Sequence, residues 1–415
     1  MLKQIAFLFV LIVSSVAFAE NLKFTKLEKI SQPIMLGNNA TMECTPGAGV
    51  VREAGSPEFH MVQVTGDHVV IRGCIIDSNS GPGSNILVTG AHVLIEHNRI
   101  LNSIHALGSV VLWSAKSATI RDNYLTEVAG GDPAGQIYGE NSVTDALIEN
   151  NEVINSSGKI GTHGIAFHEV APGSVMARIK IRGNTITAAG GFCVEVGNFG
   201  PANASVPLED VEISGNTCKL AADGHGGYSV LLIRKLLVDH NVFHANGFHS
   251  QIAPIEIHKT QGTITNNTAD MEGLGYGATC ERCFSSVWTN NVITGINAQN
   301  KNAYGLHVEV SPGVGISDAD GTSASDNRFE DNRFEFAPGQ RGIGIWQQCN
   351  QKTARCVNNT YIHNTIVSAP SPRIYGIVLQ NDGGESSNTR VVNNVFNGSK
   401  TEPVTRGRVK GTVTQ

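Results

Sequence analysis

Acid–base side chains cluster in short apolar segments in the middle of this sequence of 415 residues. The segment PIEIHK contains Glu256, His258 and Lys259, and related segments contain Glu195 and Glu309. Glutamate, histidine and lysine commonly transfer protons in enzymes, and two carboxylic acids together can hydrolyse a glycosidic bond. An exposed sheet face also needs polar residues, so the ordinary alternative is a solvated surface without chemistry.

A repeated motif must position these segments. Each copy reads apolar, x, x, Asn, x, apolar, as in IEHNRI, IENNEV and ISGNTC. Copies such as Asn98 and Asn123 are 25 residues apart, which matches one turn of a β-solenoid. The same slot is filled at Asn151, Asn184, Asn216, Asn241, Asn267, Asn291, Asn332, Asn364 and Asn394.

Stacked coils explain this repeat. One coil of three short strands cannot bury its apolar side, whereas stacked coils form a continuous core. Amides in the Asn slot can then hydrogen-bond from coil to coil and fix the register. The pattern resembles the right-handed parallel β-helix of the pectate-lyase-like superfamily, from about residue 30 to 400. The resemblance implies an all-β fold, a right-handed parallel β-helix (solenoid) of about a dozen coils with an Asn ladder.

The sequence divides into four segments. Residues 1–19 have a Lys near the start, a short apolar run and a final Ala-Phe-Ala, which is typical of a signal peptide. We expect an N-terminal cap and first coil at 20–59, the β-helix at 60–399 and a C-terminal tail at 400–415. These features predict a secreted or periplasmic protein without a membrane span. The net charge of −6 argues against nucleic acid as a partner.

Eight cysteines in an exported chain predict disulfides. The repeat brings Cys44 and Cys74 to neighbouring coils, ~4.8 Å apart, where they could form a bridge. Cys280 and Cys283 have a spacing that also occurs in metal and redox sites, but without a second such pair we favour a local disulfide or free thiols. The remaining cysteines suggest the pairs Cys193–Cys218 and Cys349–Cys356.

A second strand precedes each ladder segment, and its outward positions form two parallel rows. The first row is predicted to contain Tyr138, Ala166, Glu195, Leu231, Glu256 and His307. The second row is predicted to contain Trp113, Glu140, His168, Gly197, Ile233, His258, Glu309 and Trp346. The register around 280–284 leaves open whether Glu281 or Arg282 joins these rows.

Charged and imidazole groups occupy the middle coils of these rows, and aromatic rings lie towards both ends. That arrangement suits a polysaccharide lying along the solenoid axis, so we predict a substrate groove. Its catalytic candidates are Glu195, Glu256, His258, Lys259 and Glu309. Its substrate-binding candidates are Trp113, Tyr138, Glu140, His168, Arg282, His307 and Trp346. No metal ligands are assigned.

Two reactions fit these groups. Inverting hydrolysis needs carboxyl groups ~6.5–9.5 Å apart. Glu195 and Glu256 are predicted to lie two coils apart, at 2 × ~4.8 Å, and Glu256 and Glu309 to be spaced similarly. Elimination from a uronic acid needs a base at C5 and a cation or metal at the carboxylate, with Lys259 or His258 as the base.

The sequence has a partial similarity to the chondroitinase B and alginate lyase family. In that family a strand lysine followed by a ladder segment acts as the base, and an arginine one coil later assists it. The resemblance implies these roles for Lys259 and Arg282, and it implies calcium as a cofactor if the protein is a lyase.

Our interpretation is a secreted carbohydrate-active protein that cleaves an acidic or neutral polysaccharide. The first alternative is a non-catalytic solenoid that binds a glycan or a surface partner. The aromatic positions suffice for a binder, whereas a catalyst needs two groups that converge on one bond. A periplasmic metal-delivery solenoid is the third alternative, suggested by 14 histidines but without close His or Cys spacing to support it.

Overall fold

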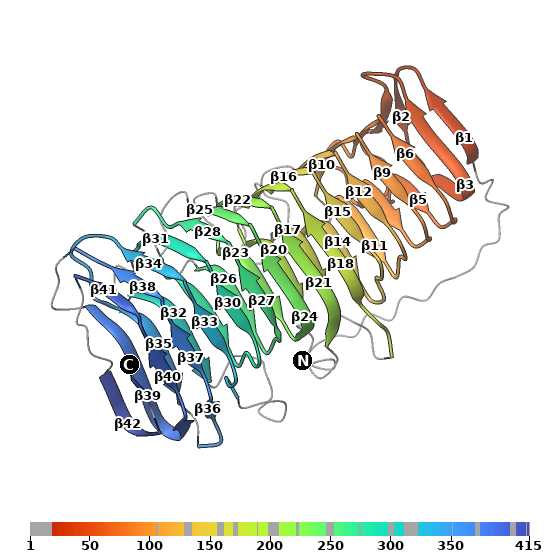
Figure 1. The fold of residues 1–415 in the computed structure, drawn as a ribbon. Coiled ribbons are helices and arrows are strands. Elements are labelled where there is room, and N and C mark those ends of the chain that lie inside the picture. Colours follow the sequence, from red (N-terminus) through yellow and green to blue (C-terminus); the bar gives the residue numbers. More distant parts are fainter. Residues whose placement is uncertain are drawn as a thin grey trace.

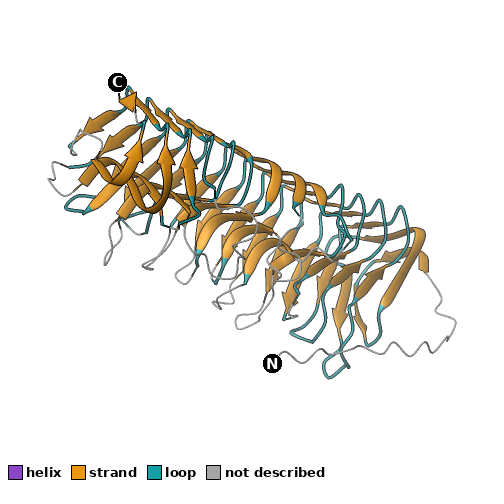
Figure 2. Ribbon diagram, turned by 90° about the horizontal axis from the view of Figure 1, so that it is seen from below, coloured by secondary structure: helices purple, strands orange, loops and turns teal. Residues whose placement is uncertain are grey.

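The computed structural model describes residues 19–414, apart from 105–106, 128–134, 156–161, 169–172, 189, 198–206, 221–223, 246–252, 274, 298–302, 311–322, 351, 370–373, 399–403 and 412. The described residues form strands and turns and contain no helix (Figure 2). The chain winds into an elongated solenoid, with its first and last strands at opposite ends (Figure 1).

Three columns of parallel strands run along the solenoid, because each coil contributes one strand to each column. The first column carries the candidate site. Its strands are β5 (Val62–Val64), β8 (Ile86–Val88), β11 (Val110–Trp113), β14 (Gly135–Glu140), β17 (His163–His168), β20 (Phe192–Gly197), β23 (Gly226–Leu231), β26 (Ala253–His258), β29 (Ala278–Glu281), β32 (Ala303–Val310) and β35 (Gly342–Cys349).

The second column continues from the first after a bend in each coil. Its strands are β6 (Val70–Arg72), β9 (Leu94–Glu96), β12 (Thr119–Arg121), β15 (Leu147–Glu149), β18 (Ala177–Arg182), β21 (Leu208–Ser214), β24 (Ile233–Asp239), β27 (Gly262–Thr265), β30 (Val287–Thr289), β33 (Arg328–Glu330), β37 (Thr360–Ile362), β40 (Arg390–Val392) and β43 (Val413–Thr414). Longer or bridging strands join the two columns near the ends: β1 (Ala19–Phe24), β3 (Ile34–Cys44), β36 (Arg355–Val357), β39 (Ile374–Ser387) and β42 (Val404–Lys410).

The third column is a separate sheet that closes each coil. Its strands are β2 (Leu27–Ile30), β4 (Gly49–Arg52), β7 (Ile75–Asp77), β10 (Arg99–Ser103), β13 (Tyr124–Glu127), β16 (Glu152–Asn155), β19 (Thr185–Ala188), β22 (Thr217–Leu220), β25 (Val242–His244), β28 (Thr268–Asp270), β31 (Val292–Ile296), β34 (Arg333–Phe336), β38 (Thr365–Val367) and β41 (Val395–Asn397).

Apolar side chains fill the interior, as period-two alternation predicts. Each of these side chains stabilises the fold by about 1.5–3 kcal/mol when it is removed from water. One stack along the first column, at most 2% exposed, contains Ile137, Ile165, Val194, Tyr228 and Ile255. The alternate residues of the same strands must therefore face outward, which gives the rows their side chains.

The predicted Asn ladder is confirmed. The Asn98 side-chain amide donates to Asn123 Oδ1 at 3.0 Å and to the Ile71 carbonyl at 3.0 Å. The amide-to-amide bond then repeats through Asn151, Asn184, Asn216, Asn241, Asn267, Asn291, Asn332, Asn364 and Asn394. Because these buried amides are satisfied only in one alignment of the coils, the ladder fixes the register of the outward rows.

The disulfide predictions are also confirmed. The bonded pairs are Cys44–Cys74, Cys193–Cys218 and Cys349–Cys356. Cys280 and Cys283 form a fourth, local disulfide, so their sulfurs are not available as thiolate ligands.

The ends of the chain leave several sequence predictions open. Residues 1–18, nearly all of the predicted signal peptide, lie outside the described residues. The boundaries proposed for 20–59, 60–399 and 400–415 remain predictions. In the described part of the chain, no helix is long and apolar enough to cross a membrane.

Candidate functional site

Outward side chains of the first column form two rows along the solenoid. The first row contains Val111, Tyr138, Ala166, Glu195, Ser229, Glu256, Thr279, His307 and Trp346. The second row contains Trp113, Glu140, His168, Gly197, Leu231, His258, Glu281, Glu309 and Gln348. We call these two rows the outer face.

The predicted position of Leu231 was wrong. Strand β20 pairs Glu195 with Ser229 and Gly197 with Leu231, so Leu231 belongs to the second row. The predicted position of Ile233 was wrong as well, because this residue begins β24 in the second column. Both errors arise in the segment YSVLLIR. Its consecutive apolar residues Leu231, Leu232 and Ile233 give no alternation that would mark the bend between β23 and β24.

Trp346 was predicted in the second row but lies in the first. Strands β32 and β35 pair His307 with Trp346 and Glu309 with Gln348. The open question around residues 280–284 is also answered, since Glu281 pairs with Glu309 and therefore lies in the second row. Arg282 follows at the bend that ends the strand, with a φ of 54°.

The Glu195 cluster, which consists of His163, His168 and Glu195, brings one carboxylate between two imidazoles. Glu195 Oε2 lies 2.9 Å from His163 Nε2 and 2.8 Å from His168 Nε2. Burial alone would raise the pKa of Glu195, but the two imidazole contacts outweigh it and hold the pKa well below its usual range. Glu195 is therefore ionised at neutral pH.

His163 has a fixed orientation in this cluster. Its Nδ1 accepts a hydrogen bond from the Phe192 main-chain N–H at 3.0 Å, and the two rings stack 6.0 Å apart. With a lone pair on Nδ1, the proton lies on Nε2 and is donated to Glu195. His163 was not predicted from the sequence, although the strand HGIAFHE carries it five residues before His168.

The same three side chains could in principle ligate a metal, since their ligand atoms lie within 4.8 Å of one another. A neutral imidazole that binds a metal through Nε2 carries its proton on Nδ1, usually donated to an acceptor. At His163 that position meets a donor, the Phe192 N–H. The hydrogen bonding of His163 thus favours a proton on Nε2 over a metal ion.

The His258 cluster, which consists of Glu256, His258 and Glu281, has the reverse composition. His258 Nδ1 lies 2.9 Å from Glu281 Oε2, and its Nε2 lies 3.6 Å from Glu256 Oε2. Burial alone would lower the pKa of His258, but the two carboxylates raise it to about 10. His258 is therefore an imidazolium at neutral pH.

His307 lies beside the His258 cluster in a more apolar setting. Its ring stacks on Trp346 at 4.4 Å, and its Nε2 lies 3.0 Å from Gln348 Oε1. Burial lowers the pKa of His307, against the opposing effect of Glu309, whose Oε1 is 3.5 Å from Nδ1. The outer face thus holds imidazoles in contrasting protonation states.

Lys259 and Arg282 lie at equivalent bends in successive coils. The main-chain N–H of Lys259 donates to the Glu281 carbonyl, and that of Arg282 donates to the Glu309 carbonyl. Both residues are buried, with exposures of 4% and 1%. Neither side chain is therefore presented to solvent.

The three aromatic candidates differ in accessibility. Trp113 is 40% exposed, whereas Tyr138 is 3% exposed and packs against Val111 and Ala166. One face of the Trp346 ring is covered by His307. Among the three, Trp113 offers the open ring that stacking on a sugar requires.

The two pairs of carboxylates that the sequence suggested differ in their Cα separation. Glu195 and Glu256 share the first row with Ser229 between them, so their Cα atoms are two strand spacings apart, about 10 Å. Glu256 and Glu309 lie in different rows, and the offset along the strands brings their Cα separation to about 12 Å. Both pairs lie two coils apart, as predicted, and the second has the longer Cα separation.

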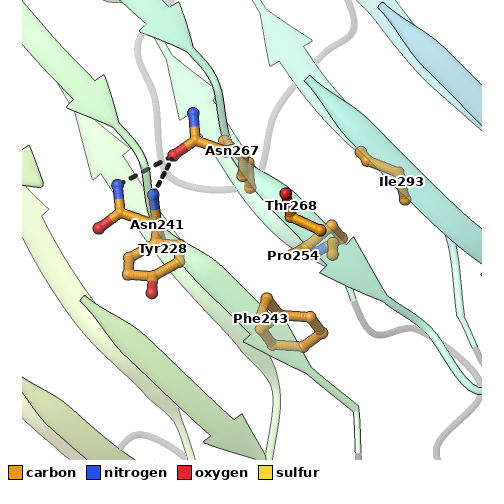
Figure 3. Close-up of a pocket in the computed structure, with 9 residues that line it drawn as sticks. Tyr228, Asn241, Phe243, Pro254, Asn267, Thr268 and Ile293 are labelled. Atoms are coloured by element: carbon orange, nitrogen blue, oxygen red, sulfur yellow. Dashed lines mark hydrogen bonds between the residues drawn. The ribbon is translucent and has the colours of Figure 1, made fainter. Parts of the chain in front are cut away.

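An apolar hollow inside the solenoid is distinct from this face (Figure 3). Tyr228, Phe243 and Ile293 line it, and its polar border is the ladder bond between Asn241 and Asn267. The Tyr228 hydroxyl donates to the Asn216 carbonyl at 3.1 Å. Since its polar groups are satisfied and its lining belongs to the core, the hollow offers no acid–base chemistry.

Comparison with known proteins agrees with this architecture. A family model described as a right-handed β-helix region matches residues 59–216. The chain is a right-handed parallel β-helix. No curated protein sequence matches this β-helix significantly.

Solved structures share the fold at low sequence identity. A GH136 lacto-N-biosidase from Eubacterium ramulus is 11% identical, with 91% of this β-helix and 68% of that chain covered and a TM-score of 0.50. A mutant tailspike protein of E. coli bacteriophage HK620 is 14% identical, with coverages of 92% and 72% and a TM-score of 0.56. A further tailspike mutant, in complex with a hexasaccharide, is 12% identical, with coverages of 92% and 72% and a TM-score of 0.52. At these identities the likeness concerns the fold.

Proposed function

We propose that this β-helix binds a polysaccharide along its outer face and hydrolyses it between Glu195 and Glu256. Structures of the same fold include a lacto-N-biosidase and a tailspike in complex with a hexasaccharide, which makes a glycan the natural ligand to test. The observation that carries the proposal is the placement of two carboxylates in one row, with the small Ser229 between them.

Glu195 is assigned the role of general base. Its carboxylate is ionised at neutral pH, and His163 and His168 fix its position. The Cα atoms of Glu195 and Glu256 are about 10 Å apart, and inverting hydrolysis requires their carboxyl groups to lie ~6.5–9.5 Å apart with room for a water molecule.

The general acid is the pair of Glu256 and His258. His258 brings the proton to this pair as an imidazolium, and its Nε2 lies 3.6 Å from Glu256 Oε2. Both side chains are partly exposed, at 21% and 25%, so the pair can contact the leaving oxygen. Glu281, on the far side of the ring, keeps the imidazole in place.

The burial of two cations favours hydrolysis over elimination in this proposal. A lyase base must reach the C5 proton of the substrate, and its cation must reach the uronate carboxylate. Lys259 and Arg282 are 4% and 1% exposed, so they are poorly placed for either task. A role in holding Glu281 and Glu309 suits them better.

We propose an extracellular or periplasmic location. All eight cysteines are disulfide-bonded, which is typical of proteins that mature in an oxidising compartment. The signal-like sequence at residues 1–19 agrees with this placement.

The test is to incubate the purified protein with neutral and uronic polysaccharides while reducing ends and unsaturated uronate products are measured together. Reducing ends without unsaturated products, lost in Glu195→Gln and in Glu256→Gln, would support hydrolysis. NMR of the first products should show an inverted anomeric centre. Unsaturated products that persist in both variants would refute the assignment.

A further inference from the structure

We infer that the outer face selects a neutral polysaccharide and rejects polymers of uronic acids. The inference rests on the proposed function only in that the glycan lies on this face, and it concerns binding rather than cleavage. It follows from the distribution of charge over the two rows and at the bends of Lys259 and Arg282 that follow them.

The outer face is negative. Its carboxylates are Glu140, Glu195, Glu256, Glu281 and Glu309. Among the described residues of the two rows and of the bends at 259 and 282, three cations oppose them, the imidazolium of His258 and the buried side chains of Lys259 and Arg282. Five negative and three positive charges leave a net charge of −2, so a polyanion approaching this face meets repulsion.

The carboxylates of the outer face are more accessible to a ligand than its cations. The Glu256 and Glu309 side chains are 25% and 18% exposed, whereas Lys259 and Arg282 are at most 4% exposed. Recognition of a carboxylate depends on charged hydrogen bonds from Arg or Lys that touch it directly. Of the three cations His258, Lys259 and Arg282, only His258 is partly exposed, at 21%. Its two ring nitrogens already face Glu256 and Glu281.

Calcium could reverse this selectivity if it bridged protein and uronate carboxylates. Ca²⁺ takes six to eight oxygen ligands, several of them from carboxylates. Within the described part of the outer face, the one group of three potential ligands is the Glu195 cluster, which has two imidazoles and a single carboxylate. That composition does not suit calcium.

A neutral sugar suits the face better. Its hydroxyl groups can donate to carboxylates such as Glu256 and Glu309, and hydrogen bonds to charged groups are the stronger kind. The exposed ring of Trp113, in the same row as Glu309, can stack on an uncharged sugar. Neither contact needs a cation.

The experiment compares matched polymers, galactan with polygalacturonate and mannan with polymannuronate, by affinity electrophoresis at low and physiological salt, with and without Ca²⁺. We expect retention by at least one neutral polymer and by neither uronate. Retention by a uronate in preference to its neutral partner, with or without Ca²⁺, would overturn the inference.

A charge variant provides the second arm. The double substitution Glu256→Gln with Glu309→Gln should gain retention by uronates at low salt. The control, Glu335→Gln with Glu385→Gln, removes the same charge from exposed ion pairs with Arg333 and Arg355 and should gain none. Equal behaviour of the two variants would contradict a role for the face charge.

The outcomes separate this inference from hydrolysis. Retention by a neutral polymer without cleavage would leave the selectivity in place and remove the catalytic proposal. Cleavage of a uronate would remove the selectivity. Retention by none of the polymers, in the wild type and both variants, would count against a glycan on this face.

Discussion

The two clusters on the outer face are inversions of each other. In one, the Glu195 carboxylate lies between two imidazoles, and in the other, the His258 imidazole lies between two carboxylates. In both, burial alone would favour the neutral form of the central group, and its two neighbours reverse that preference. The comparison teaches that the central group becomes charged when it has two partners that stabilise its charge.

The two clusters therefore differ in what they can do with a proton. The Glu195 cluster holds an ionised acceptor, and the His258 cluster holds a proton. Ser229 on β23, a small buried residue, lies between Glu195 and Glu256, so a donor and an acceptor flank one position in the row. A face with two copies of the same cluster would have two acceptors or two donors, but not one of each.

Substitution of either carboxylate beside Ser229 should have the largest effect. Glu195→Gln removes the base and Glu256→Gln removes one member of the acid pair, so each should lower the cleavage rate by about 10²–10⁴-fold. The measurement is the initial rate of reducing-end release, with circular dichroism to verify folding. As a control, Glu335→Gln alters a carboxylate in the third column and should leave the rate unchanged. Full activity in Glu195→Gln would remove the base assignment.

The side chain at position 229 can be enlarged. Ser229→Leu should place a branched side chain between Glu195 and Glu256 and lower the rate by about a hundredfold, since small displacements at a reacting bond are costly. Ser229→Ala, which keeps the side chain small, is the matched control. If leucine were tolerated as well as alanine, the two clusters could not act on a bond above β23.

The fold and much of the face follow from the sequence. The spacing of the ladder asparagines gives the coil, and period-two alternation gives the inward and outward sides of each strand. These signals are local and periodic, so a single sequence reveals them. The same logic placed Glu195, Glu256 and His258 on the face.

The errors arise where the pattern weakens. Leu231 and Ile233 were misplaced because a run of apolar residues conceals the bend at Leu232, which has a φ of 58°. Glu281 remained ambiguous because Cys280 and Cys283 interrupt the alternation. His163 was missed because its role depends on Nδ1 accepting the Phe192 N–H, a contact between coils that no local pattern encodes.

The clusters should stabilise the fold in opposite pH ranges. The pKa of Glu195 lies below its unfolded value of 4.5, so its contribution is complete above that pH and is lost as the pH falls through the folded value. His258 has a folded pKa of about 10 and an unfolded value of 6.5, so its contribution is complete below 6.5 and is lost as the pH rises towards 10.

Unfolding of the variants tests this opposition. Glu195→Gln and His258→Gln should each lower the free energy of unfolding by about 1.5–3 kcal/mol, the range for hydrogen bonds to charged groups. The first deficit should shrink in acid and the second in alkali, as measured by denaturant titration across pH. Parallel pH profiles for the two variants would contradict the assigned protonation states.

His163 offers a finer test of the Glu195 cluster. His163→Gln can keep a donor to Glu195, whereas His163→Asn can keep only an acceptor for the Phe192 N–H. If His163 positions Glu195, asparagine should lower the cleavage rate by about tenfold to a hundredfold and shift the acidic limb of its pH profile upward, and glutamine should restore most of both. Equal losses in the two variants would indicate a packing role.

Trp113 should have the smallest effect because it lies far from both clusters. Three strand spacings separate β11 from β20, about 14 Å, so a ring stacked on Trp113 belongs to a sugar several units from the bond that breaks. Trp113→Ala should raise KM for long oligosaccharides by about two- to tenfold, the value of one aromatic contact, and leave kcat unchanged. Trp113→Phe should retain most of the affinity, and substrates too short to reach β11 should not distinguish the variants. An equal loss for short and long substrates would mean that Trp113 stabilises the fold and does not contact the glycan. The glycan would then not extend along the row as far as β11.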